Sequence, residues 1–191
     1  KEAAAVRLTE DLEVKVRLID CVGFMAEGHR DISKMNQERQ VKTPWFDYEI
    51  PFTKAAAIGT QKVIHDHSTI GIVVTTDGSI GELPRENYVA AEEKTVRELQ
   101  SIGKPFLILL NCKKPYTEEA KALQRSLEEK YGVSVVALNC EQMKVEDIHE
   151  IMRRVLYEFP VSEVAFYLPK WVEMLSIEHP IKQELCIRCR I

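Results

Sequence analysis

Three short, mostly apolar segments limit most strongly what this chain can fold into. They are Ile70–Thr76, Pro105–Asn111 and Val133–Asn139, and each ends in a polar residue. Strands with this composition are typically covered on both faces, as in the parallel sheets of α/β proteins. Helical patterns alternate with these segments, and strands that alternate with helices form a parallel sheet with right-handed crossovers. The sequence therefore predicts an α/β fold.

Apolar residues at helical spacing predict four helices. The predicted helices are Thr53–His65, Glu86–Ser101, Thr117–Tyr131 and Val145–Phe159. Thr53 and Thr117 can each accept a backbone hydrogen bond as an N-cap residue. Gly132 is suited to the left-handed conformation that commonly ends a helix.

The first fifty residues are expected to form a hairpin followed by a long loop. Ala5–Leu8 and Val14–Asp20 flank a polar turn and are predicted to pair as antiparallel strands. From Phe24 to Pro51, charges, glycine and proline interrupt the apolar pattern, and a loop of this length is usually functional or mobile. The aromatic residues between positions 45 and 48 either anchor that loop by packing or form a patch that binds a partner.

The second strand of the hairpin leads to Asp20 and Gly23, which have the spacing Asp-x-x-Gly. In phosphate-binding nucleotide hydrolases such a carboxylate holds Mg²⁺, usually through water, because a hard cation keeps several of its waters. The glycine lets a backbone N–H approach the terminal phosphate with no Cβ in the way. This short motif also recurs in ordinary turns. Asp20 and Gly23 are therefore either catalytic and metal-side residues or parts of a turn.

Polar residues also follow the three apolar segments. In an open parallel sheet, ligands bind beyond the carboxyl ends of the strands, so Asp77, Asn111 and Lys113 are candidate nucleotide-binding residues. Asp77 precedes Gly78, a pair that favours a turn. Asn111 is expected to hold loops together near the base. Lys113 either packs its stem against the base ring or lies in solvent.

The order of strands, helices and polar ends is that of small GTPase-like domains. In those domains an Asn-Lys-x-Asp follows the strand that corresponds to residues 106–110, and its Asp pairs with guanine. Lys114 occupies that position here, and a cation cannot accept hydrogen bonds from the guanine edge. Adenine is the expected base, and an ordinary GTPase is disfavoured. The expected fold is a three-layer P-loop NTPase with a mostly parallel sheet and an antiparallel hairpin.

Seven longer strings of residues carry a closer resemblance. They are Thr43–Trp45, Ile50–Phe52, Ala56–Thr60, His67–Gly71, Thr75–Gly81, Gly103–Phe106 and Tyr157–Pro160. Together they resemble the stage IV sporulation protein A family of spore-coat morphogenetic ATPases. The similarity extends over nearly the whole chain, to about His179.

The resemblance implies a protein that binds ATP and Mg²⁺ and hydrolyses ATP in the cytoplasm of the mother cell of a spore-forming bacterium. It further implies self-assembly at the forespore surface, peripheral on the outer forespore membrane, as the base layer of the spore coat. The implied partners are further copies of the protein, a small membrane-anchoring peptide and coat proteins. The alternative is a non-catalytic structural module with a vestigial nucleotide site.

No stretch of the chain matches Gly-x-x-x-x-Gly-Lys-Ser/Thr, the P-loop whose backbone N–H groups and lysine hold the phosphates. In the family the P-loop and its strand lie upstream of the position of Lys1, so the domain is expected to be N-terminally truncated. In the GTPase-like order that strand lies between the strand leading to Asp20 and the strand at 70–76. Residues 1–191 alone are therefore expected to be marginally stable and to hydrolyse little ATP.

The chain is expected to divide after Pro160, with residues 1–160 as a partial P-loop ATPase domain and residues 161–191 as a linker or the start of a following domain. A net charge of −4 with no strong Lys and Arg cluster argues against a nucleic-acid partner. No apolar run approaches the roughly 18 residues of a membrane span. Five cysteines without a dense framework suit a reducing cytoplasm.

Overall fold

A computed structural model describes residues 3–8, 10, 12–26, 39–160, 167 and 169–188. The chain forms two compact units, Lys1–Pro160 and Val161–Ile191. In the second unit the described elements are α5 (Lys170–Glu173) and α6 (Pro180–Arg188). The remaining strands and helices belong to the first unit, which contains every candidate site residue.

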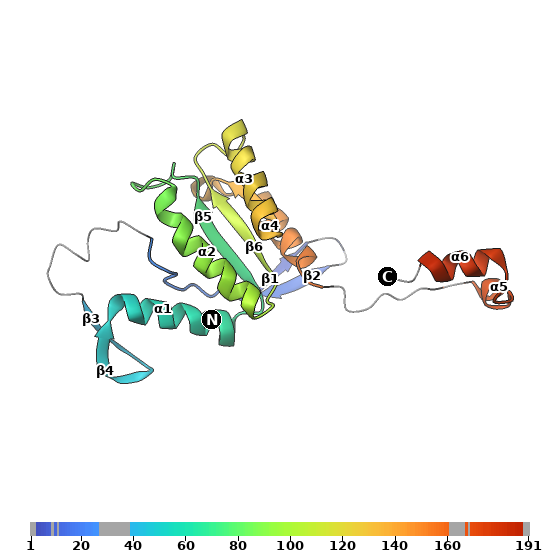
Figure 1. The fold of residues 1–191 in the computed structure, drawn as a ribbon, viewed down its shortest axis with the longest axis horizontal. Helices are drawn as coiled ribbons and strands as arrows, with labels where there is room; N and C mark the ends of the chain where they lie inside the picture. Colours follow the sequence, from blue (N-terminus) through green and yellow to red (C-terminus); the bar gives the residue numbers. More distant parts are fainter. Residues whose placement is uncertain are drawn as a thin grey trace. The chain divides into compact units, whose positions relative to one another are not determined.

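The first unit is built on a three-stranded parallel sheet. Its strands are β5 (Gly71–Thr76), β6 (Phe106–Asn111) and β7 (Val135–Leu138), in the order β5-β6-β7. Figure 1 shows β5 and β6 side by side. The helices that alternate with them are α2 (Glu86–Ser101), α3 (Glu118–Tyr131) and α4 (Val145–Tyr157). The predicted α/β class and the alternation of strands and helices are confirmed.

The core lies on both faces of this sheet, because successive residues of a strand point to opposite sides. Ile108 and Leu110 of β6 pack in one cluster with side chains of α2 and α3. Leu107 and Leu109 pack in a second cluster with side chains of α4. All four leucine and isoleucine side chains are buried. The first unit therefore has the expected three layers, helices–sheet–helix.

The residues predicted to begin and end α3 are confirmed, whereas the N-cap predicted for the helix before β5 is wrong. Thr117 Oγ1 accepts the Ala120 N–H at 3.3 Å, and Gly132 has a φ of 67° after the last turn of α3. Thr53, however, does not cap the helix before β5. That helix, α1 (Phe52–Lys62), already begins after Pro51, whose ring fixes φ near the helical value. A π-helical turn, η1 (Val63–His67), continues it.

The N-terminal hairpin is confirmed, but its second strand is shorter than predicted. The strands β1 (Ala4–Arg7) and β2 (Glu13–Val16) pair antiparallel, with Ala4 opposite Val16. Beyond Val16 no described residue of β1 remains to pair with, and the chain continues to residue 26 without regular structure. Asp20 therefore does not end a strand, which corrects the prediction of a strand from Val14 to Asp20.

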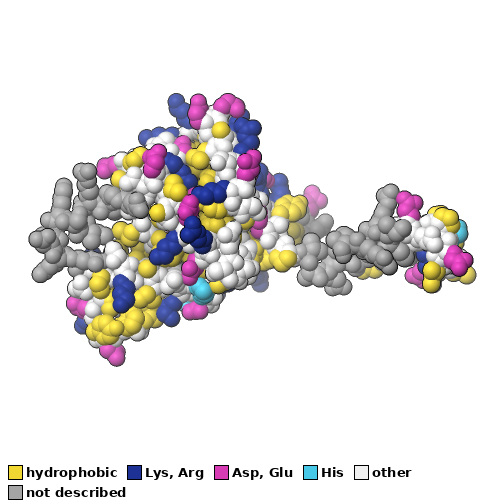
Figure 2. All heavy atoms as spheres, in the orientation of Figure 1, with side chains coloured by type: hydrophobic (Ala, Val, Ile, Leu, Met, Phe, Trp, Pro, Cys, Tyr) yellow, Lys and Arg dark blue, Asp and Glu magenta, His cyan; other side chains and the backbone are white. Residues whose placement is uncertain are grey.

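The prediction of a continuous loop from Phe24 to Pro51 is wrong from residue 40 onward, where two strands form. Residues 27–38 of the predicted loop lie outside the described residues. The strands β3 (Gln40–Thr43) and β4 (Phe46–Pro51) form a second antiparallel hairpin, which contacts α1. Ile50 is only 2% exposed and anchors this hairpin in the unit. Trp45 lies against Gly59 of α1, and hydrophobic side chains gather at the lower left of Figure 2 over this hairpin.

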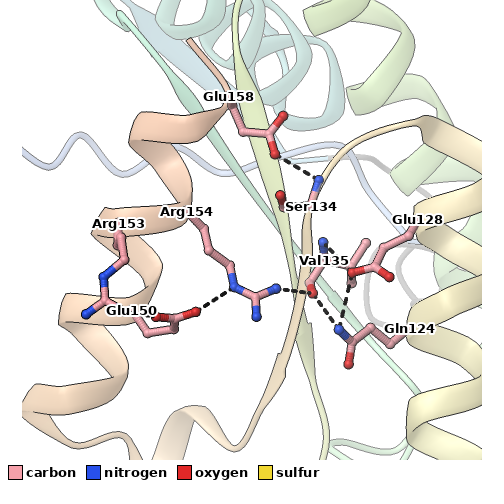
Figure 3. A network of polar contacts seen from close by, with 8 residues as sticks. All are labelled: Gln124, Glu128, Ser134, Val135, Glu150, Arg153, Arg154 and Glu158. Atoms are coloured by element: carbon pink, nitrogen blue, oxygen red, sulfur yellow. Dashed lines mark hydrogen bonds and ion pairs between the residues drawn. The ribbon is translucent and has the colours of Figure 1, made fainter.

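Side chains cover the outer edge of β7 (Figure 3). The Val135 N–H donates to Glu128 Oε1 at 3.3 Å, and the Val135 carbonyl accepts from Gln124 Nε2 at 2.8 Å. Arg154 Nη1 donates to the same carbonyl at 3.4 Å, and its Nε donates to Glu150 Oε1 at 2.8 Å. At Val135 the backbone N–H and C=O groups that point away from β6 are therefore satisfied by side chains of α3 and α4.

Candidate functional site

The parallel register brings the carboxyl ends of the three strands to one edge of the sheet. Thr76 of β5 is paired with Asn111 of β6, and Asn111 with Leu138 of β7. The loops that follow these strands are therefore neighbours, and they contain the predicted residues Asp77, Asn111 and Lys113. This edge is where an open parallel sheet binds its ligands.

Asp77 closes the turn after β5. Its Oδ1 accepts the Ser79 N–H at 2.9 Å and the Ser79 hydroxyl at 2.6 Å. Gly78 between them has a φ of 87°, a conformation that glycine adopts without steric cost. Asp77 thus has the turn-forming contacts that an Asp-Gly pair favours, at the edge where the candidate nucleotide site lies.

Asn111 and Asn139 connect the loops after β6 and β7. Asn111 Oδ1 accepts the Cys140 N–H at 3.0 Å. Asn139 Nδ2 donates to the Lys113 carbonyl at 3.4 Å, and its Oδ1 accepts the Glu141 N–H at 3.0 Å. Asn111 therefore holds two loops together, while the side chain of Lys113 is exposed.

The thiols near this edge are poor nucleophiles. Burial raises the pKa of the Cys112 thiol to about 11, and the negative charge of Asp77 adds to the shift. Burial also raises the pKa of Cys140. A thiol with a raised pKa carries little thiolate at neutral pH, and the thiolate is the reactive form. These two side chains pack as small apolar groups and offer no covalent chemistry.

Asp20 and Gly23 line a different part of the unit. They border a cavity of about 440 Å³ together with Thr60 of α1, Thr75 of β5 and Glu92 of α2. Asp20 is exposed and makes no hydrogen bond or ion pair with any residue that the structure describes. Gly23 has a φ of 77°, which a side chain would strain. The lining of this cavity includes Asp20 and Gly23 but not Asp77, Asn111 or Lys113.

A second cavity, of about 720 Å³, continues along the same strand. It lies between the end of β2 with the segment that follows it, which include Val16 and Leu18, the β5 residue Ile72, and the α4 residue Val155. In the described structure β5 has no strand on this side. Val74 of β5 and Leu18 are consequently 61% and 78% exposed. The described residues therefore leave this side of β5, called the slot below, without a neighbouring strand and with exposed apolar side chains.

Sequence reasoning missed a buried ion pair next to the candidate site. Arg85 Nη2 lies 2.6 Å from Glu92 Oε2, and Arg85 Nη1 donates to Thr75 Oγ1 at 2.8 Å. Glu92 Oε1 accepts the Tyr131 hydroxyl at 2.8 Å. Glu92 Oε2 has no well-aligned hydrogen bond, so its interaction with Arg85 is mainly the electrostatic attraction of opposite charges. The available signal was the position of Glu92 on the inward face of α2, four residues before the buried Val96.

The described residues hold neither a multidentate metal cage nor a membrane-crossing helix. Among them, no three His, Cys, Asp or Glu side chains come together as they would around a metal ion. None of their helices is long and apolar enough to cross a lipid bilayer.

The fold and its carboxyl edge define a class of protein. A parallel sheet between helices, with an antiparallel hairpin beside it and polar loops at its carboxyl edge, is the architecture of P-loop-like α/β domains. Residues 1–160 match the family model described as "Stage IV sporulation protein A, ATPase domain". The chain belongs to the stage IV sporulation protein A family.

Curated relatives agree with this assignment. Stage IV sporulation protein A of Bacillus anthracis is 44% identical over 182 residues, which are 95% of this chain and 37% of that protein. The proteins of the same name from Bacillus subtilis (strain 168) and Clostridioides difficile (strain 630) are 43% and 45% identical, over 95% and 96% of this chain. The chain thus spans less than two fifths of the length of these relatives, which are covered to 37% and 38%. No solved structure matches significantly.

Proposed function

We propose that this chain is part of a morphogenetic ATPase that binds ATP with Mg²⁺ and hydrolyses ATP to ADP and phosphate. The observation that carries the proposal is the match of residues 1–160 to the ATPase domain of the family. The polar loops at the carboxyl edge of the parallel sheet support it, because this is where such sheets bind ligands.

Asp20 and Gly23 are proposed to act at the phosphate end of the nucleotide. The Asp20 carboxylate is exposed and makes no contact with described residues that would compete for it, and Mg²⁺ commonly uses one or two carboxylates and several waters. When bound, Mg²⁺ neutralises charge on the phosphates. Gly23 presents its backbone with no side chain in the way, and we assign its N–H to the γ-phosphate.

The loops after β5 and β6 are proposed to bind the base. Asp77 and Asn111 fix the backbone of these loops, and Lys113 offers an exposed stem beside them. Lys114 stands where a guanine-reading carboxylate would be needed, so the proposed base is adenine.

The slot beside β5 is proposed to receive the P-loop strand of the complete domain. Three features support this placement: the unpaired edge of β5, the exposed Val74, and the cavities that separate β5 from the segment after β2. A protein extended upstream should therefore melt at a higher temperature and hydrolyse ATP faster than residues 1–191 alone. Equal stability and equal turnover in both would refute this part of the proposal.

The cellular role is proposed from membership of the family and from the names of the relatives. In this role the protein assembles with further copies of itself into the base layer of the spore coat. It is peripheral on the outer forespore membrane, on the mother-cell side, and is anchored by a small membrane-bound peptide. Later coat proteins then bind to this layer.

Turnover of ATP and GTP by the full-length protein tests the proposal, with Asp20→Ala as the variant. We expect ATP to be preferred and Asp20→Ala to lower kcat by about a hundredfold, as is typical when one charge-stabilising group is removed. Asp47→Ala, at an exposed position of β4, is the matched control and should leave kcat unchanged. Unchanged turnover by Asp20→Ala would refute the assigned role. A wild-type protein without turnover would instead favour the non-catalytic structural module.

A further inference from the structure

The side chain of Ser79 joins the loop after β5 to the loop after β6. Its hydroxyl donates to Asp77 Oδ1 at 2.6 Å and accepts the Lys113 N–H at 2.9 Å. A carboxylate can only accept, so the hydroxyl proton points to Asp77 and a lone pair remains for Lys113. The hydroxyl is held in one orientation by these two partners.

The loop that carries Ser79 is itself fixed at its far end. Arg85 donates to Thr75 Oγ1 at 2.8 Å and pairs with the buried Glu92. The two ends of the loop also touch, because a Cβ built on Gly78 would lie 2.7 Å from the Arg85 backbone nitrogen. The position of the Ser79 hydroxyl is therefore set by the sheet and by α2.

Both backbone polar groups of Lys113 are thereby engaged. Its N–H is bound by Ser79, and its carbonyl accepts from Asn139 Nδ2 at 3.4 Å. The peptide units before and after Lys113 each carry one of these bonds, so neither can rotate without losing it. The side chains of Lys113 and Lys114 are exposed in this loop and can reach a ligand there.

We propose that Ser79 is a positioning residue for the nucleotide base: it fixes the Lys113–Lys114 backbone and so sets the preference of this edge for adenine over guanine. The inference rests on the proposed function, because it concerns the same nucleotide. Asp20 and Gly23 border a cavity whose lining does not include Ser79 or Lys113. The effect of Ser79 should therefore be confined to the base and should not extend to the phosphates.

Equilibrium binding to the full-length protein tests this assignment, with Mg²⁺ and three ligands: ATP, GTP and inorganic tripolyphosphate. Ser79→Ala should raise the Kd for ATP roughly three- to tenfold, the effect of losing one positioned hydrogen bond. The ratio of the ATP and GTP affinities should fall, and the Kd for tripolyphosphate should not change. Ser79→Thr, which keeps the hydroxyl, should restore the ATP affinity. Ser126→Ala, at an exposed position of α3, should match the wild type.

Two results with Ser79→Ala would overturn the inference. One is an unchanged Kd for ATP and an unchanged preference over GTP. The other is an equal weakening of ATP and tripolyphosphate, which would mean that the serine only supports the fold. Failure of the proposed function gives a different result from failure of the Ser79 inference, because the wild-type protein itself would then not bind ATP. In that case the inference about Ser79 would also be refuted.

Discussion

Replacement of Glu92 by Gln should destabilise the domain strongly, because Glu92 is a buried carboxylate with charged and polar partners. Its side chain is 1% exposed, Arg85 Nη2 lies at 2.6 Å, and the Tyr131 hydroxyl donates to it at 2.8 Å. Removing one member of a buried ion pair costs about 3–5 kcal/mol, since the other charge stays buried without compensation. Arg85 is 16% exposed and keeps its bond to Thr75, which places the expected loss at the lower end, about 3 kcal/mol.

Thermal unfolding of the domain within the full-length protein measures this loss. For a domain of this size 1 kcal/mol corresponds to about 2–4 °C, so Glu92→Gln should lower the Tm by roughly 6–12 °C. The double variant Arg85→Met with Glu92→Leu should lose less than Glu92→Gln alone, because apolar replacement of both partners is often neutral. Glu129→Gln, at an exposed position of α3, should change stability by less than about 0.5 kcal/mol.

Two outcomes would refute the reasoning about Glu92. A Tm of Glu92→Gln within a degree of the wild type would mean that the pair does not contribute to stability. A double variant that loses as much as Arg85→Met alone and Glu92→Leu alone lose together would mean that the two residues act independently, since only coupled residues depart from additivity.

Three further substitutions have defined expectations. Gly78→Ala should destabilise the domain by more than about 1 kcal/mol in urea unfolding, because its φ is 87° and the new Cβ would lie 2.7 Å from Arg85 N. Thr117→Ala should cost about 1 kcal/mol in the same assay through the lost N-cap of α3, and Thr117→Ser should restore it. The raised pKa of Cys112, about 11 in the folded protein against 9.0, means that the unfolded thiol ionises first. The free energy of unfolding should therefore fall between pH 9 and 11, and Cys112→Ala should reduce this fall.

The sequence predicted those parts of the fold whose helices and strands are determined by residues close together in the chain. The segment at β6 is apolar at successive positions because helices cover both of its faces, and the strand was found for that reason. The α3 helix was found because Thr117 and Gly132 have end conformations that few other residues favour. Each of these signals depends on residues close together in the chain.

The missed elements depend on partners that local patterns do not reveal. The apolar residues Phe46, Tyr48 and Ile50 alternate as in a strand, but intervening charges and Pro51 hid β4. The early end of β2 depends on where its partner β1 stops, which the alternation from Val14 onward does not reveal.

For the candidate site, the sequence placed polar residues at the carboxyl edge, and the register brings three of them together. It did not indicate that Asp20 and Gly23 border a cavity whose lining leaves these three residues out, because the cavity follows from packing. It also did not identify Ser79, whose role depends on hydrogen bonds to Asp77 and to Lys113, a residue 34 positions away in the chain.

The side chains that cover β7 at Val135 have a consequence for the assembly proposed above. Edge strands with free N–H and C=O groups are templates for uncontrolled growth of cross-β aggregates, and a high local concentration increases that danger. The Val135 N–H and C=O already bond to side chains of Glu128, Gln124 and Arg154, so another strand cannot pair with them. At Val135 the outer edge of β7 therefore offers no free backbone group to a strand of another copy. In the coat layer proposed above, copies are then expected to meet through side chains rather than by strand pairing at Val135.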